Sequence, residues 1–274
     1  MSEDTLAVET GAPPRRMLAG ISYREAGDAA APALVLLHGV GSGSASWSTQ
    51  FGTLSGGWRI IAWDAPGYGV SDALQPAIPA AADYAAALER FVVALRLAKF
   101  CLLGHSLGAL IAAAYCRLAG TRVEKLVLAA PTTGYGRETP EGQYARIKDR
   151  LTAIQELGPE GLAEKRGPQL FAGNPPAKAL AQARAVMRQL RPDGYVQALQ
   201  MLSRGDIFAD APSIKAPTLV LCGSGDTVTP EANCRRIAGA IAGARFEAIP
   251  GPGHALYMEA PEQFDAALLR FLAR

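Results

Sequence analysis

The sequence contains few histidines and no long apolar run. Histidine occurs only at positions 38, 105 and 254 of the 274 residues, so chemistry that needs an imidazole base has few candidates. No window approaches the roughly 20 apolar residues of a membrane-spanning helix. Residues 1–16 lack the apolar segment of a signal peptide, and we interpret them as a frayed leader ahead of the first strand.

An excess of charge of one sign is also missing. The chain has 27 basic and 25 acidic residues, which does not favour nucleic acid or an anionic membrane as a partner. Its cysteines show neither a CxxC pair nor a metal-ligand spacing, and we expect no metal and no cofactor. Cys101 and Cys222 lie in apolar runs, where buried free thiols are usual. We therefore expect a reducing, cytoplasmic location.

The chain does contain a series of short apolar runs that end in glycine or a polar turn. Their nearly continuous apolar character is typical of strands covered on both faces. Helical stretches, such as 83–98 and 107–118, separate several of them. The alternation predicts an α/β fold with a doubly wound, mainly parallel sheet, and residues 20–23 predict an earlier antiparallel edge strand. The runs span 33–37, 59–63, 100–103, 123–129, 218–221 and 245–249.

One segment breaks this alternation. Residues 132–212 contain no convincing strand but do contain charged, alanine-rich helical stretches. Glycine and proline interrupt these stretches repeatedly, as at 158–159 and 174–176. We interpret this segment as a helical insertion between two strands.

The strongest chemical signal is the sequence Gly-His-Ser-Leu-Gly at residues 104–108, between a predicted strand and a predicted helix. This G-x-S-x-G pattern in that context is a nucleophile elbow. Small residues two positions before and after Ser106 allow the strand and the helix to approach closely, and the turn strains the serine backbone. We therefore expect the Ser106 hydroxyl to face a crevice at the carboxyl edge of the sheet.

A serine hydroxyl needs a base before it can act as a nucleophile. His105 is adjacent to Ser106 in the sequence, so its side chain should point elsewhere. His38 ends a predicted strand and is better placed to shape the glycine-rich loop that follows. His254 lies in a Gly/Pro-rich loop after the last predicted strand. By elimination, His254 is the predicted base.

The base in turn needs a carboxylate that holds its tautomer. Asp226 lies in the loop just after the apolar run 218–221, and the resulting chain order Ser106, Asp226, His254 is the one that accompanies such an elbow. Asp64 is the main competitor. We interpret it as a turn-organising carboxylate, because it precedes the nucleophile and a Pro-Gly turn follows it, and Asp72 as a surface or turn residue.

The oxyanion of the reaction needs hydrogen-bond donors. One predicted donor is the backbone N–H of Leu107, directly after the serine, and the other is the N–H of Val40 in the glycine-rich loop 38–44. That loop lacks both the Gly-Lys-Ser/Thr ending of a P-loop and the G-x-G-x-x-G pattern of a dinucleotide site. We therefore discount nucleotide binding.

Together these segments resemble the α/β-hydrolase superfamily. The matching segments are 38–41, 64–72, 104–108, 223–226, 253–254 and 259–262. The resemblance covers most of residues 17–131 and 213–274. It implies a sheet of about eight strands with helices on both faces and a helical cap over the active site. The predicted domains are a core of residues 1–131 and 213–274 and a cap of residues 132–212.

The resemblance also bears on the reaction. Haloalkane dehalogenases and epoxide hydrolases place an aspartate at the nucleophile, so Ser106 argues against both. Carbon–carbon hydrolases of the meta-cleavage type usually carry a tryptophan shortly after the catalytic histidine, whereas residues 255–258 here read Ala-Leu-Tyr-Met. We predict a serine hydrolase, monomeric or homodimeric, that cleaves a small carboxylic ester or lactone. The alternatives are such a carbon–carbon hydrolase, a ligand receptor on the same fold, or a cofactor-free oxygenase that uses only His254 and Asp226.

The cap would select the substrate. An arginine such as Arg137 or Arg146 could meet a substrate carboxylate, and the sequence leaves this open. Apolar and aromatic side chains could instead line the pocket, although each is more often ordinary packing. These candidates are Trp47, Tyr135, Tyr144, Phe171, Met187, Tyr195 and Phe208.

Overall fold

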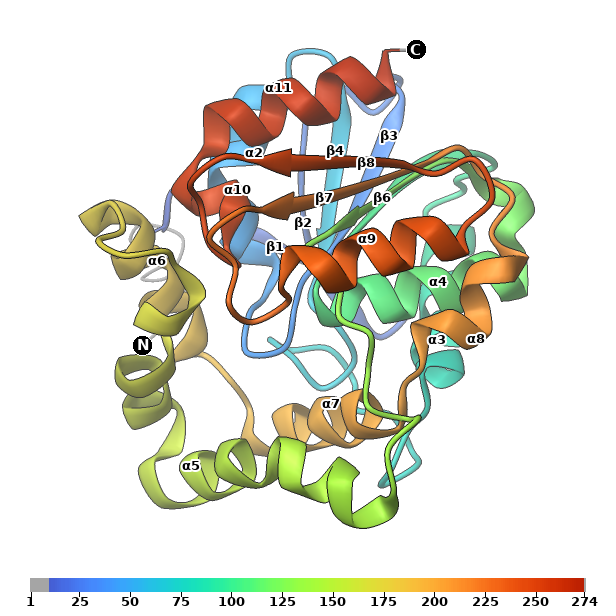
Figure 1. The fold of residues 1–274 in the computed structure, drawn as a ribbon. Coiled ribbons are helices and arrows are strands. Elements are labelled where there is room, and N and C mark those ends of the chain that lie inside the picture. Colours follow the sequence, from blue (N-terminus) through green and yellow to red (C-terminus); the bar gives the residue numbers. More distant parts are fainter. Residues whose placement is uncertain (1–9, 274) are drawn as a thin grey trace.

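The computed structural model describes residues 10–273, which form an eight-stranded sheet of order β1-β2-β4-β3-β5-β6-β7-β8 (Figure 1). β1 and β2 pair antiparallel, as do β2 and β4, and every other pairing in the sheet is parallel. The predicted mainly parallel α/β sheet is therefore confirmed. The strands are β1 (Arg15–Leu18), β2 (Ile21–Ala26), β3 (Ala33–Leu37), β4 (Arg59–Trp63), β5 (Phe100–His105), β6 (Val123–Ala129), β7 (Thr218–Gly223) and β8 (Arg245–Ile249).

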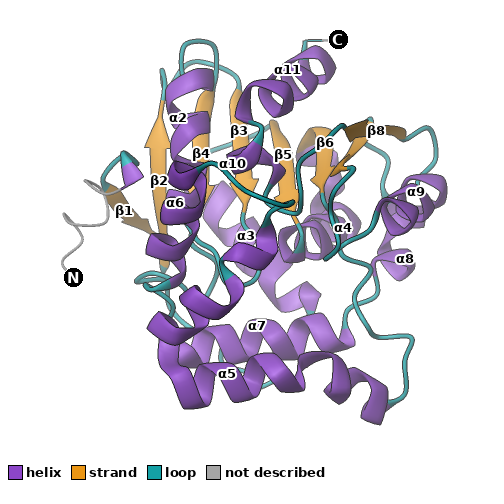
Figure 2. Ribbon diagram, turned by 60° about the vertical axis from the view of Figure 1, so that its left-hand side comes forward, coloured by secondary structure: helices purple, strands orange, loops and turns teal. Residues whose placement is uncertain are grey.

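Helices cover both faces of the sheet (Figure 2). One apolar cluster joins Val35 and Leu37 of β3 to helices α3, α4 and α9, and a second joins Leu34 and Leu36 of the same strand to helices α2, α10 and α11. Every residue of β3 is buried, which explains why its sequence is apolar throughout. The helices are α2 (Ser48–Leu54), α3 (Ala81–Ala94), α4 (Leu107–Ala119), α5 (Pro140–Arg166), α6 (Ala177–Met187), α7 (Pro192–Arg204), α8 (Ile207–Asp210), α9 (Glu231–Ala240), α10 (Leu256–Glu259) and α11 (Pro261–Leu272).

The N-terminal edge of the sheet differs from the prediction. Arg15 and Arg16 belong to β1, so the interpretation of residues 1–16 as a frayed leader is wrong at its end, and its residues 1–9 lie outside the described residues. The antiparallel strand predicted at 20–23 exists as β2, but β1 and not β2 forms the edge. A tight turn at Ala19 and Gly20, both at positive φ, joins the two strands. Because β1 has only four residues, it does not stand out as an apolar run in the sequence.

The predicted helical insertion is present between β6 and β7. Helices α5, α6 and α7 lie on one side of the core (Figures 1 and 2), and α5 bends at Gly158, whose φ of 63° precedes a proline. The short helix α8 packs on α4 of the core, although its residues fall within the range 132–212. The division into a core and a cap at those boundaries stays a prediction.

The turn between β5 and α4 is the local feature that sets up the site. Ser106 lies between the two elements with φ 52° and ψ −111°, a conformation that side-chain-bearing residues rarely adopt. A Cβ added at Gly104 would come within 3.0 Å of backbone atoms of Gly108, and one added at Gly108 would meet the carbonyl oxygen of Leu37. The two glycines therefore allow the close strand–helix contact that the strained turn requires.

This packing predicts a large effect for a single methyl group. We expect Gly104→Ala to lower the free energy of unfolding by about 3 kcal/mol, because backbone rather than a flexible side chain occupies the space. Chemical denaturation measures this quantity. Gly52→Ala is the matched control, because a Cβ there meets nothing within 4 Å. Equal stability of the two variants would contradict the role assigned to Gly104.

Candidate active site

Three of the predicted site residues lie at the carboxyl ends of parallel strands. Ser106 follows β5, Asp226 follows β7 and His254 follows β8. The residues are buried, with exposed fractions of 6%, 5% and 4%. Carboxyl ends of parallel strands lie at one edge of the sheet, where α/β folds place their ligands. The sheet thus brings together residues that are far apart in the sequence.

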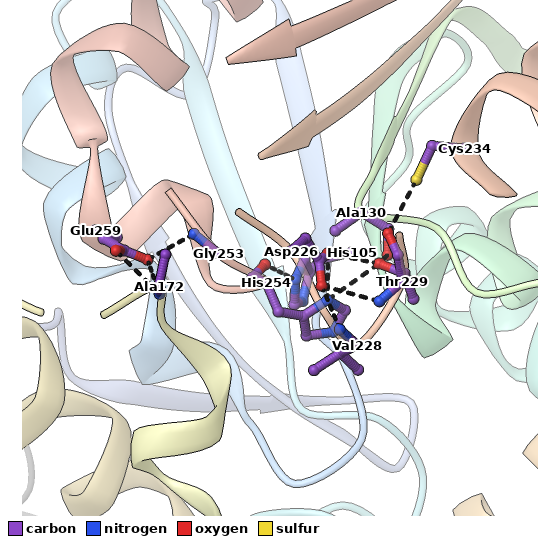
Figure 3. Close-up of polar contacts among 10 residues, drawn as sticks. All are labelled: His105, Ala130, Ala172, Asp226, Val228, Thr229, Cys234, Gly253, His254 and Glu259. Carbon is purple, nitrogen blue, oxygen red and sulfur yellow. Dashed lines mark hydrogen bonds and ion pairs between the residues drawn. The ribbon is translucent and has the colours of Figure 1, made fainter. Parts of the chain in front are cut away.

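Asp226 and His254 form a direct hydrogen bond. Nδ1 of His254 lies 2.9 Å from Oδ2 of Asp226 (Figure 3). The second carboxylate oxygen of Asp226 accepts the backbone N–H groups of Val228 and Thr229, at 2.7 and 2.8 Å. Nδ1 therefore carries the proton of the imidazole, and Nε2 is free to accept one.

The surroundings of Asp226 also favour the ionised form of its carboxyl group. Burial raises the pKa of its carboxyl group, but hydrogen bonds from His254 and Thr229 outweigh burial and leave the pKa below its usual value. The carboxylate is therefore ionised at neutral pH. A depressed pKa in the folded state contributes stability above the pKa of the unfolded chain, and this contribution is lost as the pH falls through the folded pKa.

Thr229 completes this group and was not identified from the sequence. Its hydroxyl donates to Oδ2 of Asp226 at 2.6 Å and lies 3.1 Å from the carbonyl oxygen of Ala130 and 3.2 Å from Nδ1 of His254. An Asp that accepts N–H groups two and three residues later is a turn pattern, which could have drawn attention to this threonine. Thr229 restricts the carboxylate to the orientation that faces His254.

The other two histidines are committed to the backbone. Nε2 of His105 lies 2.9 Å from the carbonyl oxygen of His254, and burial together with the neighbouring His254 lowers the pKa of His105 to about 3. Nε2 of His38 accepts the N–H of Ala65, so Nδ1 donates to the carbonyl oxygen of Gly39. Burial lowers the pKa of His38 as well. Neither is placed to act as a base, which leaves His254.

Ser106 and His254 line the same cavity, together with Val40. Among the described residues the Ser106 hydroxyl has no hydrogen-bond partner, and such bonds often tighten only when substrate binds. Leu107 is the first residue of α4, where a backbone N–H has no acceptor within the helix. The roles of the Val40 and Leu107 N–H groups as oxyanion donors stay a prediction.

Asp64 has a different environment from Asp226. Its carboxylate accepts the N–H of Ser44 and the hydroxyl of Ser22, both at 2.8 Å, and Nε of Arg15 lies 3.2 Å away. It thereby ties the glycine-rich loop 38–44 to β2, as a turn-organising carboxylate would. Asp72 is exposed, as expected.

Glu259 links the His254 loop to the helical insertion. Its carboxylate accepts the N–H of Gly253 at 2.8 Å and that of Ala172 at 3.1 Å (Figure 3). A backbone hydrogen bond from Ala255 to Leu170 joins the same two segments. Glu259 lies in the matching segment 259–262, but the sequence did not reveal this contact. It fixes the backbone on which His254 is carried.

We expect Glu259→Ala to lower the free energy of unfolding by about 2 kcal/mol, because two backbone N–H groups lose a charged acceptor. Its kcat should fall as well, since the His254 backbone loses its anchor. Denaturation and steady-state kinetics measure the two effects. Glu262→Ala, at an exposed position on α11, is the control. A Glu259→Ala variant as stable and as active as this control would rule out the anchoring role.

The cavity beside Ser106 is open to solvent and has a volume of about 560 Å³ when that opening is included. Tyr135, Met187 and Tyr195 line it, and their role in substrate binding stays a prediction. Its lining residues are Val40, Gly41, Ser106, Thr132, Tyr135, Arg150, Arg166, Leu170, Met187, Tyr195, Leu202, Val228, Thr229 and His254.

The other four pocket candidates do not line this cavity, and those predictions are wrong. Trp47 is fully buried and stacks on Tyr257 with the ring centroids 4.1 Å apart. Phe171 is buried in the core cluster on the α11 face of the sheet, and Tyr144 is 55% exposed. Phe208 packs beneath guanidinium groups outside the cavity. Aromatic character alone does not separate pocket positions from core or surface positions.

The arginines that line the cavity are not the two named as examples from the sequence. Arg137 pairs with Asp206 and Arg146 pairs with Glu138, and neither lines the cavity. Arg150 and Arg166 line it instead.

Within residues 10–273 no three His, Cys, Asp or Glu side chains gather as a metal site. Cys101, Cys116, Cys222 and Cys234 are all buried free thiols. In the same range no helix combines the length and apolar composition needed to cross a bilayer.

Comparison with known proteins places these features in context. A model described as "Alpha/beta hydrolase family" matches residues 34–267. The protein named "Putative carbamate hydrolase RutD" from Variovorax paradoxus is 28% identical over 261 residues, which cover 93% of this chain and 96% of that protein.

Solved structures agree with this match. A thermophilic esterase from Thermogutta terrifontis is 26% identical with a TM-score of 0.83, covering 94% of this chain and 98% of that one. The enol-lactonase from Burkholderia xenovorans LB400 is 25% identical with a TM-score of 0.83, covering 95% and 100%. The core sheet and its helical insertion are those of this fold.

Proposed function

Because this chain belongs to the alpha/beta hydrolase family, we propose that it is a serine hydrolase that cleaves a carboxylic ester or lactone through an acyl-enzyme on Ser106. The observation that carries this proposal is the hydrogen bond between Asp226 and His254 at the cavity that Ser106 also lines. The esterase and the enol-lactonase among the similar structures support an ester or lactone as the scissile group.

The reaction would proceed in two steps. In the first, Oγ of Ser106 attacks the carbonyl carbon while Nε2 of His254 takes the hydroxyl proton, and Asp226 stabilises the resulting imidazolium. The N–H groups of Val40 and Leu107 would bind the oxyanion, with each donor worth about 3 kcal/mol in the transition state. His254 then gives its proton to the leaving alkoxide. In the second step His254 takes a proton from water, which attacks the acyl-serine, and His254 then returns that proton to Oγ of Ser106 as the acid is released.

We also propose that the helical insertion acts as a cap that selects the substrate. It supplies Tyr135, Met187 and Tyr195, which would surround the acyl or alcohol group. The hydrogen bonds of Glu259 to both segments would keep the cap at a fixed position relative to His254.

The test is turnover by the purified protein of matched substrates that differ in the scissile group: an aryl ester, a lactone, a carbamate and a vinylogous diketone. We expect acid release from the ester or the lactone to be fastest. Faster cleavage of the carbamate or the diketone would replace the proposed substrate class. Ligand binding without turnover would favour a receptor, and oxygen uptake without hydrolysis would favour an oxygenase.

A further inference from the structure

Arg150 and Arg166 project from the two halves of α5 into the cavity that Ser106 and His254 share. The bend at Gly158 lies between them, and α5 passes along the far side of the helical insertion from the sheet (Figure 1). Tyr135 and Tyr195 line the same cavity, and their phenol groups affect the pKa of Arg166. Ser106 and the two arginines thus line one cavity.

The two arginines lack the carboxylate partners that four other arginines of the insertion have. Among the described residues, no Asp or Glu oxygen lies within ion-pair distance of Arg150 or Arg166, and Asp149, whose charge influences Arg166, is exposed. Burial, and then the charge of Arg150, lower the pKa of Arg166. The paired arginines of the insertion are Arg137, Arg146, Arg184 and Arg188.

Two like charges in a partly buried cavity are unfavourable unless an opposite charge joins them. Water can solvate the two guanidinium groups when no ligand is bound. A bound anion would offset their repulsion and supply the hydrogen-bond acceptors that they lack. A guanidinium presents parallel N–H donors that match the two oxygens of a carboxylate. Apart from Arg150 and Arg166, no Lys, Arg, Asp or Glu lines the cavity, so the anion would sit at the arginines and not at the serine.

We propose that the substrate of this site carries a carboxylate, placed away from the scissile carbonyl, and that Arg150 and Arg166 bind it. This rests on the proposed function, because it specifies the substrate class of the same serine site. The carboxylate would orient the ester or lactone so that its carbonyl faces Ser106.

The test compares charged and neutral esters. One pair is mono-p-nitrophenyl adipate and p-nitrophenyl hexanoate, in which a methyl group replaces the carboxylate of the acyl part. The other is 3-carboxyphenyl acetate and phenyl acetate, in which the charge lies on the alcohol part. We expect the wild type to prefer the charged member of at least one pair. Arg150→Gln and Arg166→Gln should each lower kcat/KM for that ester roughly 10- to 100-fold and change the neutral ester far less.

Arg137→Gln is the matched control, because it removes the same charge from the insertion at a position outside the cavity. It should leave both esters of each pair unaffected. Equal kcat/KM for charged and neutral esters, or an equal loss on both in the Arg150→Gln and Arg166→Gln variants, would overturn the proposal.

A binding measurement separates this proposal from the proposed function. Adipate should bind to the Ser106→Ala variant in calorimetry, and adding Arg150→Gln or Arg166→Gln should weaken that binding roughly tenfold or more. Arginine-dependent adipate binding with no ester hydrolysis by the wild type would support the anion site and reject the hydrolase. Serine-dependent hydrolysis of neutral esters with neither adipate binding nor a charge preference would reject the anion site alone.

Discussion

Replacing Ser106 with alanine is expected to lower kcat for the preferred ester by on the order of 10⁴-fold or more. Without the hydroxyl no acyl-enzyme can form, and the remaining rate would come from substrate binding and the oxyanion donors. The substitution removes one oxygen that has no hydrogen-bond partner among the described residues, so folding should be preserved. Steady-state kinetics and a thermal melt measure the two effects.

Ser203→Ala is the matched control for this variant. Ser203 is buried on α7 and donates to the carbonyl oxygen of Gln200, but it does not line the cavity. It should keep the wild-type kcat. If Ser106→Ala hydrolysed esters as fast as Ser203→Ala, Ser106 would not be the nucleophile.

Asp226→Asn is expected to reduce kcat by about 10⁴-fold as well. The asparagine keeps the size of the side chain but loses the charge that stabilises the imidazolium. Its amide can also present N–H groups to His254 Nδ1, which selects the tautomer with the proton on the wrong nitrogen. Kinetics at a pH near neutrality measure the loss.

The comparison with Asp64→Asn decides between the two candidate carboxylates. Asp64 contacts Ser22 and Ser44 and no histidine, so its replacement should affect stability more than kcat. A loss of kcat in Asp64→Asn as large as that in Asp226→Asn would mean that the His254–Asp226 hydrogen bond does not set the rate.

The parts of the fold that follow from local pattern were predictable. A fully buried strand such as β3 is apolar along its whole length, and the elbow needs small residues at Gly104 and Gly108. Both features can be recognised from a few consecutive residues of the sequence. Ser106 precedes His254 in the sequence because the strand before Ser106 precedes the strand before His254.

The pocket was predicted poorly because its lining depends on how distant segments pack. Tyr144 and Tyr135 are both tyrosines near the start of the insertion, yet one is exposed and the other lines the cavity. Arg150 and Arg166 were overlooked because what distinguishes them is that they line the cavity without a carboxylate neighbour. That property depends on where Glu138 and Glu164 lie in space, since these acids pair with other arginines.

The most direct measurement is the mass of the acyl-enzyme. The tryptic peptide of residues 100–117 contains Ser106 as its single serine, so an adduct on that hydroxyl can be assigned. Rapid quenching of the protein with a slowly deacylating ester should give one acyl group on this peptide in the wild type and none in Ser106→Ala or His254→Ala. Hydrolysis that proceeds at the normal rate while residues 100–117 stay unmodified would contradict the account.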